Sequence, residues 1–197
     1  MAKSGDKTWI GTAKGLYVLE GETVKCLLPE IEIFKLFVSS RNELWIASRM
    51  RGLYKIGRDG ILKKEISASD RVVSEQIRSF VEDDQNNVWF GTFDGLQMYR
   101  PSTDTYCVYR PNFHPGSLSH ESVFSLYKDR QGTIWVGTYY GGVNYFNLKK
   151  DLFKYYVYAE ANNNCLNYPI IGQIIEDKRR DLWICTDGGG VNRFNRK

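Results

Sequence analysis

The chain alternates short apolar runs with tight turns, and the pattern recurs five times along 197 residues. In each copy a tryptophan is followed by a large apolar residue and then a small one, as in "IWVGT" at 134–138. The apolar runs have the length of strands and are rich in Val, Ile, Phe, Tyr and Trp, and glycines separate them. This pattern favours strands over helices, so the predicted fold class is all-β.

The five tryptophans divide the chain into repeats, because they are separated by 36, 44, 46 and 48 residues. A period of this size is typical of a four-stranded propeller blade. Apolar residues twelve and nine positions before each of the last four tryptophans predict a first strand, and the tryptophan lies on the second. A glycine ends the second strand, a third follows at once, and a fourth is interrupted by charges, as in an edge strand. Residues 1–197 therefore predict one β-propeller segment of four-stranded antiparallel blades. The anchors are Trp9, Trp45, Trp89, Trp135 and Trp183.

Turn chemistry repeats with the same period. Six residues before four of the anchors stands a residue whose side-chain oxygen can bind turn amides, and three residues later stands one expected at positive φ. The first set is Ser39, Asp83, Asp129 and Asp177, and the second is Asn42, Asn86, Gly132 and Arg180. Arg180 fits its position poorly. The hydroxyls of Thr12, Thr92, Thr138 and Thr186 are expected to bind turn backbone. Seam-filling residues are expected at Leu28, Val72, Leu118 and Leu166.

The strand count predicts incomplete ends. The chain is predicted to enter at the second strand of its first repeat and to stop after the third strand of its fifth, whereas propellers close with about four to eight blades. A piece of a larger propeller is the favoured interpretation, and a small closed five-bladed ring is the alternative. A piece would expose apolar blade faces.

Charge and cysteine content exclude several classes of function. The net charge of +4 is scattered, which does not support nucleic-acid binding, and the uncharged apolar runs are too short to span a membrane. The four cysteines lack the spacing of a zinc or redox motif. They are Cys26, Cys107, Cys165 and Cys185, of which Cys185 replaces a small residue and is expected to be buried.

Candidate binding residues lie in the loops between second and third strands, which gather on one face of a propeller around the channel. These loops differ in charge and ring content while their flanks repeat. Rings can stack on sugars, and Arg or Asp can bind hydroxyls or acidic groups. For each residue alone, the alternative is an ordinary solvated loop position. The predicted ligand-binding residues are Arg49, Arg51, Phe93, Asp94, Tyr139, Tyr140 and Asp187.

No catalytic residue, cofactor or metal site is predicted. The two histidines, His114 and His120, share one linker and lack a third ligand at regular spacing. The "GGG" at 188–190 is not followed by the lysine or helix of a phosphate-binding loop.

The string "V..L..D..G.IWVGT..GGVNYF" at 123–146, nearly repeated at 171–194 and preceded by "PNFHPGSLSHESV", resembles the two-component regulator propeller repeat. The copies cover almost the whole chain, although the second has "IAS" for "IGT" and Cys185 replaces a glycine. The resemblance implies the periplasmic sensor region of a bacterial hybrid two-component system. Such regions typically hold two seven-bladed propellers, followed by a β-sandwich, a membrane helix, a histidine kinase and regulator modules.

The resemblance further implies a non-enzymatic segment that senses an oligosaccharide or another small ligand for polysaccharide utilisation. Its expected partners are the remainder of the ectodomain and a second copy in a homodimer of the full-length protein, outside an inner membrane. The alternatives are a protein-interaction scaffold, or less favoured a propeller lyase or hydrolase. An enzyme would need a histidine or carboxylate pair facing the channel, and substitution of His114 or Asp94 would test for one.

Overall fold

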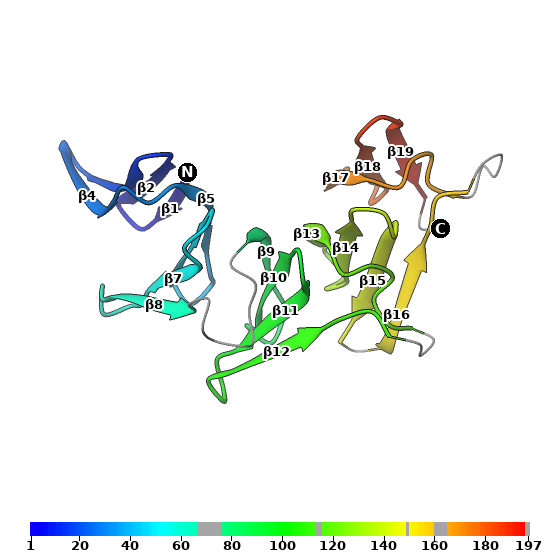
Figure 1. Ribbon diagram of the computed structural model, residues 1–197, viewed down its shortest axis with the longest axis horizontal. Coiled ribbons are helices and arrows are strands. Elements are labelled where there is room, and N and C mark those ends of the chain that lie inside the picture. The colour runs from blue at the N-terminus through cyan, green and yellow to red at the C-terminus, as the bar shows by residue number, and fades with distance from the viewer. Residues whose placement is uncertain (67–75, 113–115, 149, 160–164, 196–197) are drawn as a thin grey trace.

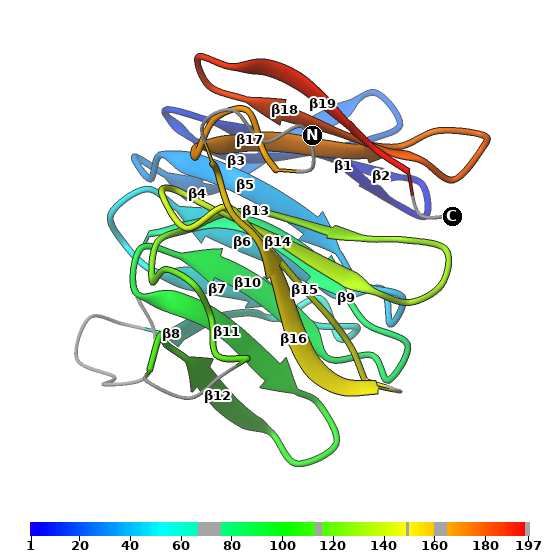
Figure 2. The ribbon, with the colours of Figure 1, turned by 90° about the vertical axis from the view of Figure 1, so that its right-hand side faces the viewer.

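Five antiparallel sheets follow one another around a common centre and form an open arc (Figure 1). This computed structural model describes residues 1–66, 76–112, 116–148, 150–159 and 165–195. Sheets 1 to 4, numbered along the chain, have four strands each, and sheet 5 has three. The view turned by 90° shows the first and last sheets on the same side of the molecule (Figure 2). None of the described residues forms a helix that could cross a membrane. The predicted all-β propeller architecture is confirmed.

Within each sheet the strands lie in chain order from the centre of the arc outwards. Sheet 1 consists of β1 (Ala2–Ser4), β2 (Lys7–Thr12), β3 (Gly15–Glu20) and β4 (Thr23–Pro29). Sheet 2 consists of β5 (Ile33–Val38), β6 (Leu44–Ser48), β7 (Leu53–Ile56) and β8 (Leu62–Ile66). Sheet 3 consists of β9 (Ile77–Glu82), β10 (Val88–Thr92), β11 (Gly95–Arg100) and β12 (Thr105–Tyr109). Sheet 4 consists of β13 (Val123–Lys128), β14 (Ile134–Thr138), β15 (Val143–Asn147) and β16 (Lys150–Tyr156). Sheet 5 consists of β17 (Ile171–Glu176), β18 (Leu182–Thr186) and β19 (Gly190–Phe194).

The first sheet has a leading strand, so the prediction that the chain enters at a second strand was wrong. β1 pairs antiparallel with β2, and Ala2 lies opposite Trp9. In sheet 4, Tyr127 lies opposite Trp135, which is one residue more than the separation in sheet 1. The shorter hairpin and the three-residue length of β1 place this strand outside the spacing that identifies the other first strands.

Each of the first four tryptophans packs between its own sheet and the next one along the chain. The ring centroids lie 5.1 Å apart for Trp45 and Tyr99, and 4.6 Å apart for Trp89 and Phe146. Trp135 is only 4 % exposed and lies 5.5 Å from Phe194. Because each hydrophobic cluster combines residues of two consecutive sheets, the indoles join the sheets into one arc.

The small residue two positions after the tryptophan is needed because the next sheet lies against it. A Cβ added to Gly91 would lie 2.6 Å from the Val123 side chain, and one added to Gly137 would lie 2.7 Å from Ile171. Sheet 5 has no following sheet among the described residues, so Cys185 meets no such neighbour. The prediction of a buried Cys185 was therefore wrong, because this side chain is half-buried.

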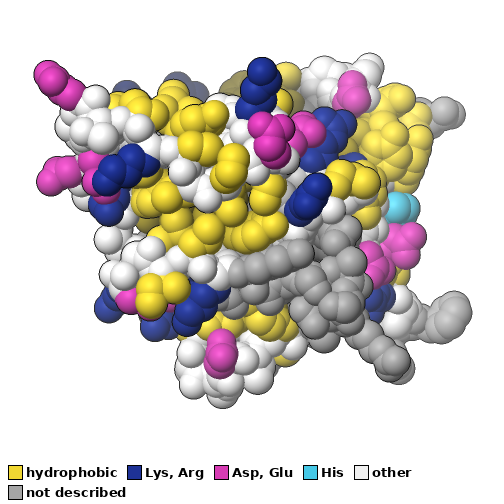
Figure 3. Space-filling model, turned by 60° about the vertical axis from the view of Figure 1, so that its left-hand side comes forward, with side chains coloured by type: hydrophobic (Ala, Val, Ile, Leu, Met, Phe, Trp, Pro, Cys, Tyr) yellow, Lys and Arg dark blue, Asp and Glu magenta, His cyan; other side chains and the backbone are white. Residues whose placement is uncertain are grey.

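The last sheet exposes a face that the other sheets bury. Val191 is 56 % exposed, whereas its counterparts in the other four sheets are 0 % exposed. These counterparts are Leu16, Leu53, Leu96 and Val143. Sheet 1 also exposes apolar side chains such as Val24, and hydrophobic side chains gather on the side of the molecule where sheets 1 and 2 lie (Figure 3). Apolar faces of this kind are expected of a partial propeller.

One carboxylate in each of sheets 3, 4 and 5 holds both the turn and the tryptophan. In sheet 4, Asp129 Oδ1 accepts hydrogen bonds from the backbone N–H groups of Gln131 and Thr133 at 2.8 and 3.0 Å. Its Oδ2 accepts from Trp135 Nε1 at 2.9 Å. The turn role is the predicted one, while the bond to the indole was not predicted. The same indole bonds join Asp83 to Trp89 and Asp177 to Trp183.

Sheets 1 and 2 lack this carboxylate. Ser39 stands at the equivalent position before Trp45, and its hydroxyl accepts a hydrogen bond from the Glu43 N–H but none from the indole in the described part of the chain. Trp9 Nε1 and Trp45 Nε1 are buried without a hydrogen-bond partner in the described part of the chain. A buried donor without a partner costs about 1–3 kcal/mol.

The remaining turn predictions are confirmed where the structure describes the residues. Arg180 adopts a φ of 69°, the left-handed conformation that it was expected to fit poorly. The four threonine hydroxyls and that of Ser48 donate to glycine carbonyls of their turns. Leu28, Leu118 and Leu166 are buried in the seams, and Val72 lies outside the described residues.

We predict that the cost of removing a tryptophan depends on the following sheet. Trp135→Ala should lower the free energy of unfolding by about 3–5 kcal/mol, because its ring is buried between two sheets. Trp183→Ala is the matched control, since this half-buried ring has the same carboxylate bond and no following sheet in the described residues. It should cost less than half as much in urea denaturation. Equal losses for the two variants would contradict the wedge between sheets.

We also predict that Ser39→Asp stabilises the protein by about 1 kcal/mol, because the new carboxylate gives Trp45 Nε1 an acceptor and keeps the bond to Glu43 N–H. The reverse change, Asp129→Ser, should destabilise it by about 1–3 kcal/mol. Thermal unfolding of both variants measures the two effects. If Ser39→Asp destabilised the protein, a missing carboxylate acceptor for the Trp45 indole would not be what weakens sheet 2.

Acid should weaken sheet 5 through Asp177. Hydrogen bonds from the Trp183 indole and from the backbone N–H groups of Arg179 and Asp181 lower the pKa of Asp177 below its usual value. The stabilisation is therefore complete above the unfolded-state pKa, about 3.9, and is lost as pH falls through the lower folded-state pKa. A pH range from about 6 to about 2 brackets the folded-state and unfolded-state pKa values of Asp177. Over this range the wild-type protein should lose more free energy of unfolding than Asp177→Asn. Identical pH profiles in urea titrations would refute this role.

Candidate functional site

A β-bulge on each innermost strand of sheets 2 to 5 sets one side chain apart. Along β5, Ile33 pairs with Ser48 and Lys35 with Ala47, so Phe34 has no partner position. The same irregularity skips the second residue of β9, β13 and β17. Bulges re-aim side chains. The skipped residues are Phe34, Arg78, Phe124 and Gly172.

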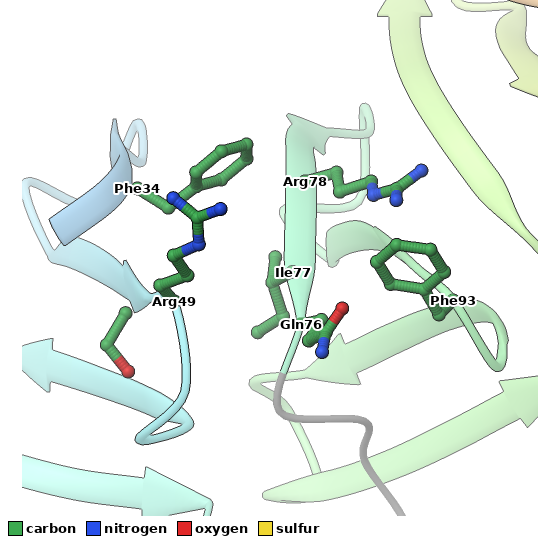
Figure 4. A pocket seen from close by; sticks show the side chains of 7 residues that line it. Phe34, Arg49, Gln76, Ile77, Arg78 and Phe93 are labelled. Carbon is green, nitrogen blue, oxygen red and sulfur yellow. The ribbon is translucent and has the colours of Figure 1, made fainter. Parts of the chain in front are cut away.

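A cavity of about 170 Å³ lies between sheets 2 and 3, beside these bulges. Phe34 and Arg49 face it from sheet 2, and Gln76 and Ile77 lie across from them on sheet 3 (Figure 4). Pockets that enclose a drug-sized ligand measure about 300–1,000 Å³. This cavity is therefore too small to enclose a drug-sized ligand and has room for a single ring or substituent. Its lining consists of Phe34, Ser48, Arg49, Gln76, Ile77, Arg78 and Phe93.

A continuous row of rings and one guanidinium runs from this cavity to sheet 4. The guanidinium carbon of Arg78 lies 3.3 Å from the centroid of the Phe93 ring and 4.3 Å from that of Phe124. Phe124 stacks on Tyr139 at 6.1 Å, and Tyr139 meets Tyr140 edge to face at 4.4 Å. The exposed fractions of Phe93 and Tyr140 are 43 % and 58 %, so the row presents ring surface to solvent.

Two of the charged candidates already have partners. Arg49 Nη1 lies 2.9 Å from Glu32 Oε1 in an exposed ion pair. Asp94 accepts two hydrogen bonds from Arg110, at 3.0 Å from Nε and 2.5 Å from Nη2. The bonds from Arg110 lower the pKa of Asp94 and raise that of Arg110. Asp94 therefore remains ionised and neutralised beside the row.

The structure brings four of the seven predicted residues into one site. Arg49 and Phe93 line the cavity, and Tyr139 and Tyr140 extend the row. Asp94 borders the row through its loop. Arg51 and Asp187 are exposed residues that do not line the cavity, and their backbone N–H groups bind Ser48 Oγ and the Ile170 carbonyl. Whether these seven residues bind a ligand remains a prediction.

Three members of the site, Phe34, Arg78 and Phe124, were missed because they lie on strands rather than loops. A signal was present in the sequence. Eleven residues before each of the last four tryptophans, beside a position that is always Ile or Val, the residue varies: it is Phe, Arg, Phe and Gly in turn. Variation next to a constant core position marks a side chain that leaves the core.

The triple glycine of the fifth repeat supports a neighbouring tyrosine. A Cβ added to Gly189 would lie 2.5 Å from the Tyr168 Cβ, and one added to Gly188 would lie 3.1 Å from its ring. The glycines therefore make room for Tyr168, whose side chain is 36 % exposed. This packing role agrees with the prediction that the segment is not a phosphate-binding loop.

The described residues contain no group of three His, Cys, Asp or Glu side chains able to hold a metal ion. His120 accepts a hydrogen bond at Nδ1 from the Ser122 N–H at 3.0 Å. His114 lies outside the described residues. All four cysteines are free thiols.

The model of the two component regulator propeller family matches residues 72–94 and 117–140. These segments include the first strands of sheets 3 and 4 and their tryptophan strands. No curated protein matches the sequence.

Solved propellers share the fold. The extracellular domain of the putative hybrid two component system BT4673 from B. thetaiotaomicron superposes with a TM-score of 0.78 at 24 % identity, covering 100 % of this chain and 27 % of that one. The corresponding domain of BT3049 from the same organism has a TM-score of 0.76 at 22 % identity, covering 98 % of this chain and 25 % of that one.

An enzyme also shares the fold, since virginiamycin B lyase from Staphylococcus aureus has a TM-score of 0.68 at 12 % identity, covering 99 % of this chain and 68 % of that one. The chain spans about a quarter of the length of the two hybrid-system domains. Likeness at these identities shows the propeller fold, and two segments of the chain, residues 72–94 and 117–140, match the two-component regulator propeller repeat.

Proposed function

We propose that the chain is a ligand-sensing propeller segment of a hybrid two-component system sensor. The family match and the shared fold support the sensor assignment. The observation that carries ligand binding is the row from Phe93 through Arg78 and Phe124 to Tyr139, which joins two sheets beside a cavity. Variable side chains on a repeated scaffold are how one fold is adapted to different ligands.

Oligosaccharides are the proposed ligands. Exposed ring faces suit the apolar faces of sugars, and neighbouring cations and amides suit their oxygen atoms. The cavity supplies both, with Phe34 and Phe93 as rings and Arg49 and Gln76 as donors. Its volume fits one sugar unit or substituent, so a longer chain would continue along the Tyr139 and Tyr140 side of the row.

The proposed setting is the periplasmic ectodomain of an inner-membrane sensor that forms a homodimer. The face of sheet 5 around Val191 would pack against the remainder of the ectodomain, because its counterparts are covered by a following sheet. Ligand binding would then shift the relation between propellers or protomers, by no more than its difference in affinity for the two arrangements.

Two other functions have an observation in their favour. The exposed apolar faces suit a protein-interaction scaffold, in which a partner covers them. Virginiamycin B lyase, an enzyme, has the same fold, which supports the enzyme alternative. Pull-down from a native extract tests the first, and turnover assays with wild type and Asp94→Asn test the second.

Calorimetry against a panel of oligosaccharides tests the proposal. At least one member should bind, and Phe93→Ala should weaken that binding by at least tenfold, because the ring lines the cavity and contacts Arg78. Ile61→Ala is the control, since this side chain is exposed just before β8 of sheet 2 and does not line the cavity. No heat from any member, or equal affinity for Phe93→Ala and wild type, would contradict the proposal.

A further inference from the structure

We infer that the cavity between sheets 2 and 3 recognises an anionic group, a carboxylate or a sulfate ester on the sugar, through the guanidinium of Arg78. This inference rests on the proposed function, because it names the chemical class of the ligand.

In the described part of the chain, the Arg78 guanidinium contacts aromatic rings rather than an acid. Phe93 and Phe124 lie 3.3 and 4.3 Å from its central carbon and cover much of its flat surface. The N–H groups of a guanidinium lie in its plane, so a guanidinium stacked between rings donates hydrogen bonds only from its edge. The rings therefore fix the direction from which a partner can approach.

The hydrogen bonds at this edge are incomplete. Nη1 of Arg78 is buried and has no hydrogen-bond partner in the described part of the chain. Burial lowers the pKa of Arg78, which the tyrosine at 139 opposes only in part. The contrast is with Arg110 and Arg193, whose pKa values are raised by hydrogen bonds to Asp94 and Asp181. Among the described residues, Arg78 is thus a partly desolvated cation without the carboxylate partner that the other two have.

The net positive charge of the cavity lining also favours an anionic group. Arg49 and Arg78 are its two charged lining residues, and Glu32 pairs with Arg49 at 2.9 Å. One positive charge therefore remains uncompensated among the described residues. A single carboxylate or sulfate would balance it.

A neutral hydroxyl would not satisfy the site equally well. It would accept the hydrogen bond of a guanidinium N–H but leave the charge uncompensated. Hydrogen bonds between ionised partners are roughly twice as strong as neutral ones, and a planar guanidinium can bind carboxylate or sulfate oxygens in pairs. The rings of Phe34 and Phe93 would meanwhile contact the sugar that carries the group.

The test is a titration followed by NMR of the arginine side-chain Nε–H signals, with the Arg78 signal assigned from its loss in Arg78→Gln. The probes are D-glucuronate, D-glucose 6-sulfate and D-glucose. At least one anion should shift the Arg78 signal saturably, with an affinity at least tenfold above that of glucose. Arg78→Gln should remove this preference, while Arg179→Gln, an exposed turn residue on the opposite side of the sheets, should retain it.

The outcomes separate the two proposals. A response to glucuronate alone identifies a carboxylate, and a response to the 6-sulfate alone identifies a sulfate ester. Equal affinities for glucose and both anions would overturn the anionic class and leave the sugar-binding function standing. Absence of any response at Arg78 and at the Phe93 ring, in protein with an unchanged near-ultraviolet circular dichroism spectrum, would overturn both. Retained preference in Arg78→Gln would show that another cation recognises the anion.

Discussion

The contact between one indole and the following sheet determines the rest of this structure. A sheet of three or four short strands cannot bury both of its faces alone, so each must pack against a neighbour. Trp135 lies between sheets 4 and 5, and Gly137 beside it lets Ile171 of the next sheet approach. The Trp135 ring and the missing side chain of Gly137 act together. Removing the ring, or adding a side chain at Gly137, would alter the distance between the two sheets. The carboxylate of Asp129 then fixes the indole to the turn of its own sheet.

This packing also creates the candidate site. Because successive sheets are held side by side, their innermost strands come together, and β9 lies against both β5 and β13. The bulge residues of these strands are thereby brought next to the loops of the same face. Arg78 of β9 can then contact Phe124 of β13. The row joins sheets 3 and 4, while the cavity is shared by sheets 2 and 3.

The sequence was sufficient for the architecture because the signals that specify it are local and repeated. Apolar spacing, turn glycines and the tryptophan period identified every strand except β1, which is only three residues long. The burial of Cys185 could not be predicted, since it depends on whether another sheet follows. The bond from Asp129 to Trp135 was also missed, because turn chemistry alone already accounted for an aspartate at that position.

The site was less predictable because it depends on contacts between repeats. Loop variability identified Arg49, Phe93, Tyr139 and Tyr140, but strand alternation does not reveal a bulge, so Arg78 was missed. Asp94 was predicted to bind a ligand, but it pairs with Arg110. The sequence alone does not reveal this pairing, because it depends on where β12 places Arg110.

Hydrogen exchange of the five indole N–H groups, resolved by NMR, tests the central claim most directly. The account predicts slow exchange for Trp89 and Trp135, which are buried between sheets and bonded to carboxylates, and faster exchange for the half-buried Trp183. Uniformly fast exchange of all five groups would contradict it, because the indoles would then contact water rather than the neighbouring sheets.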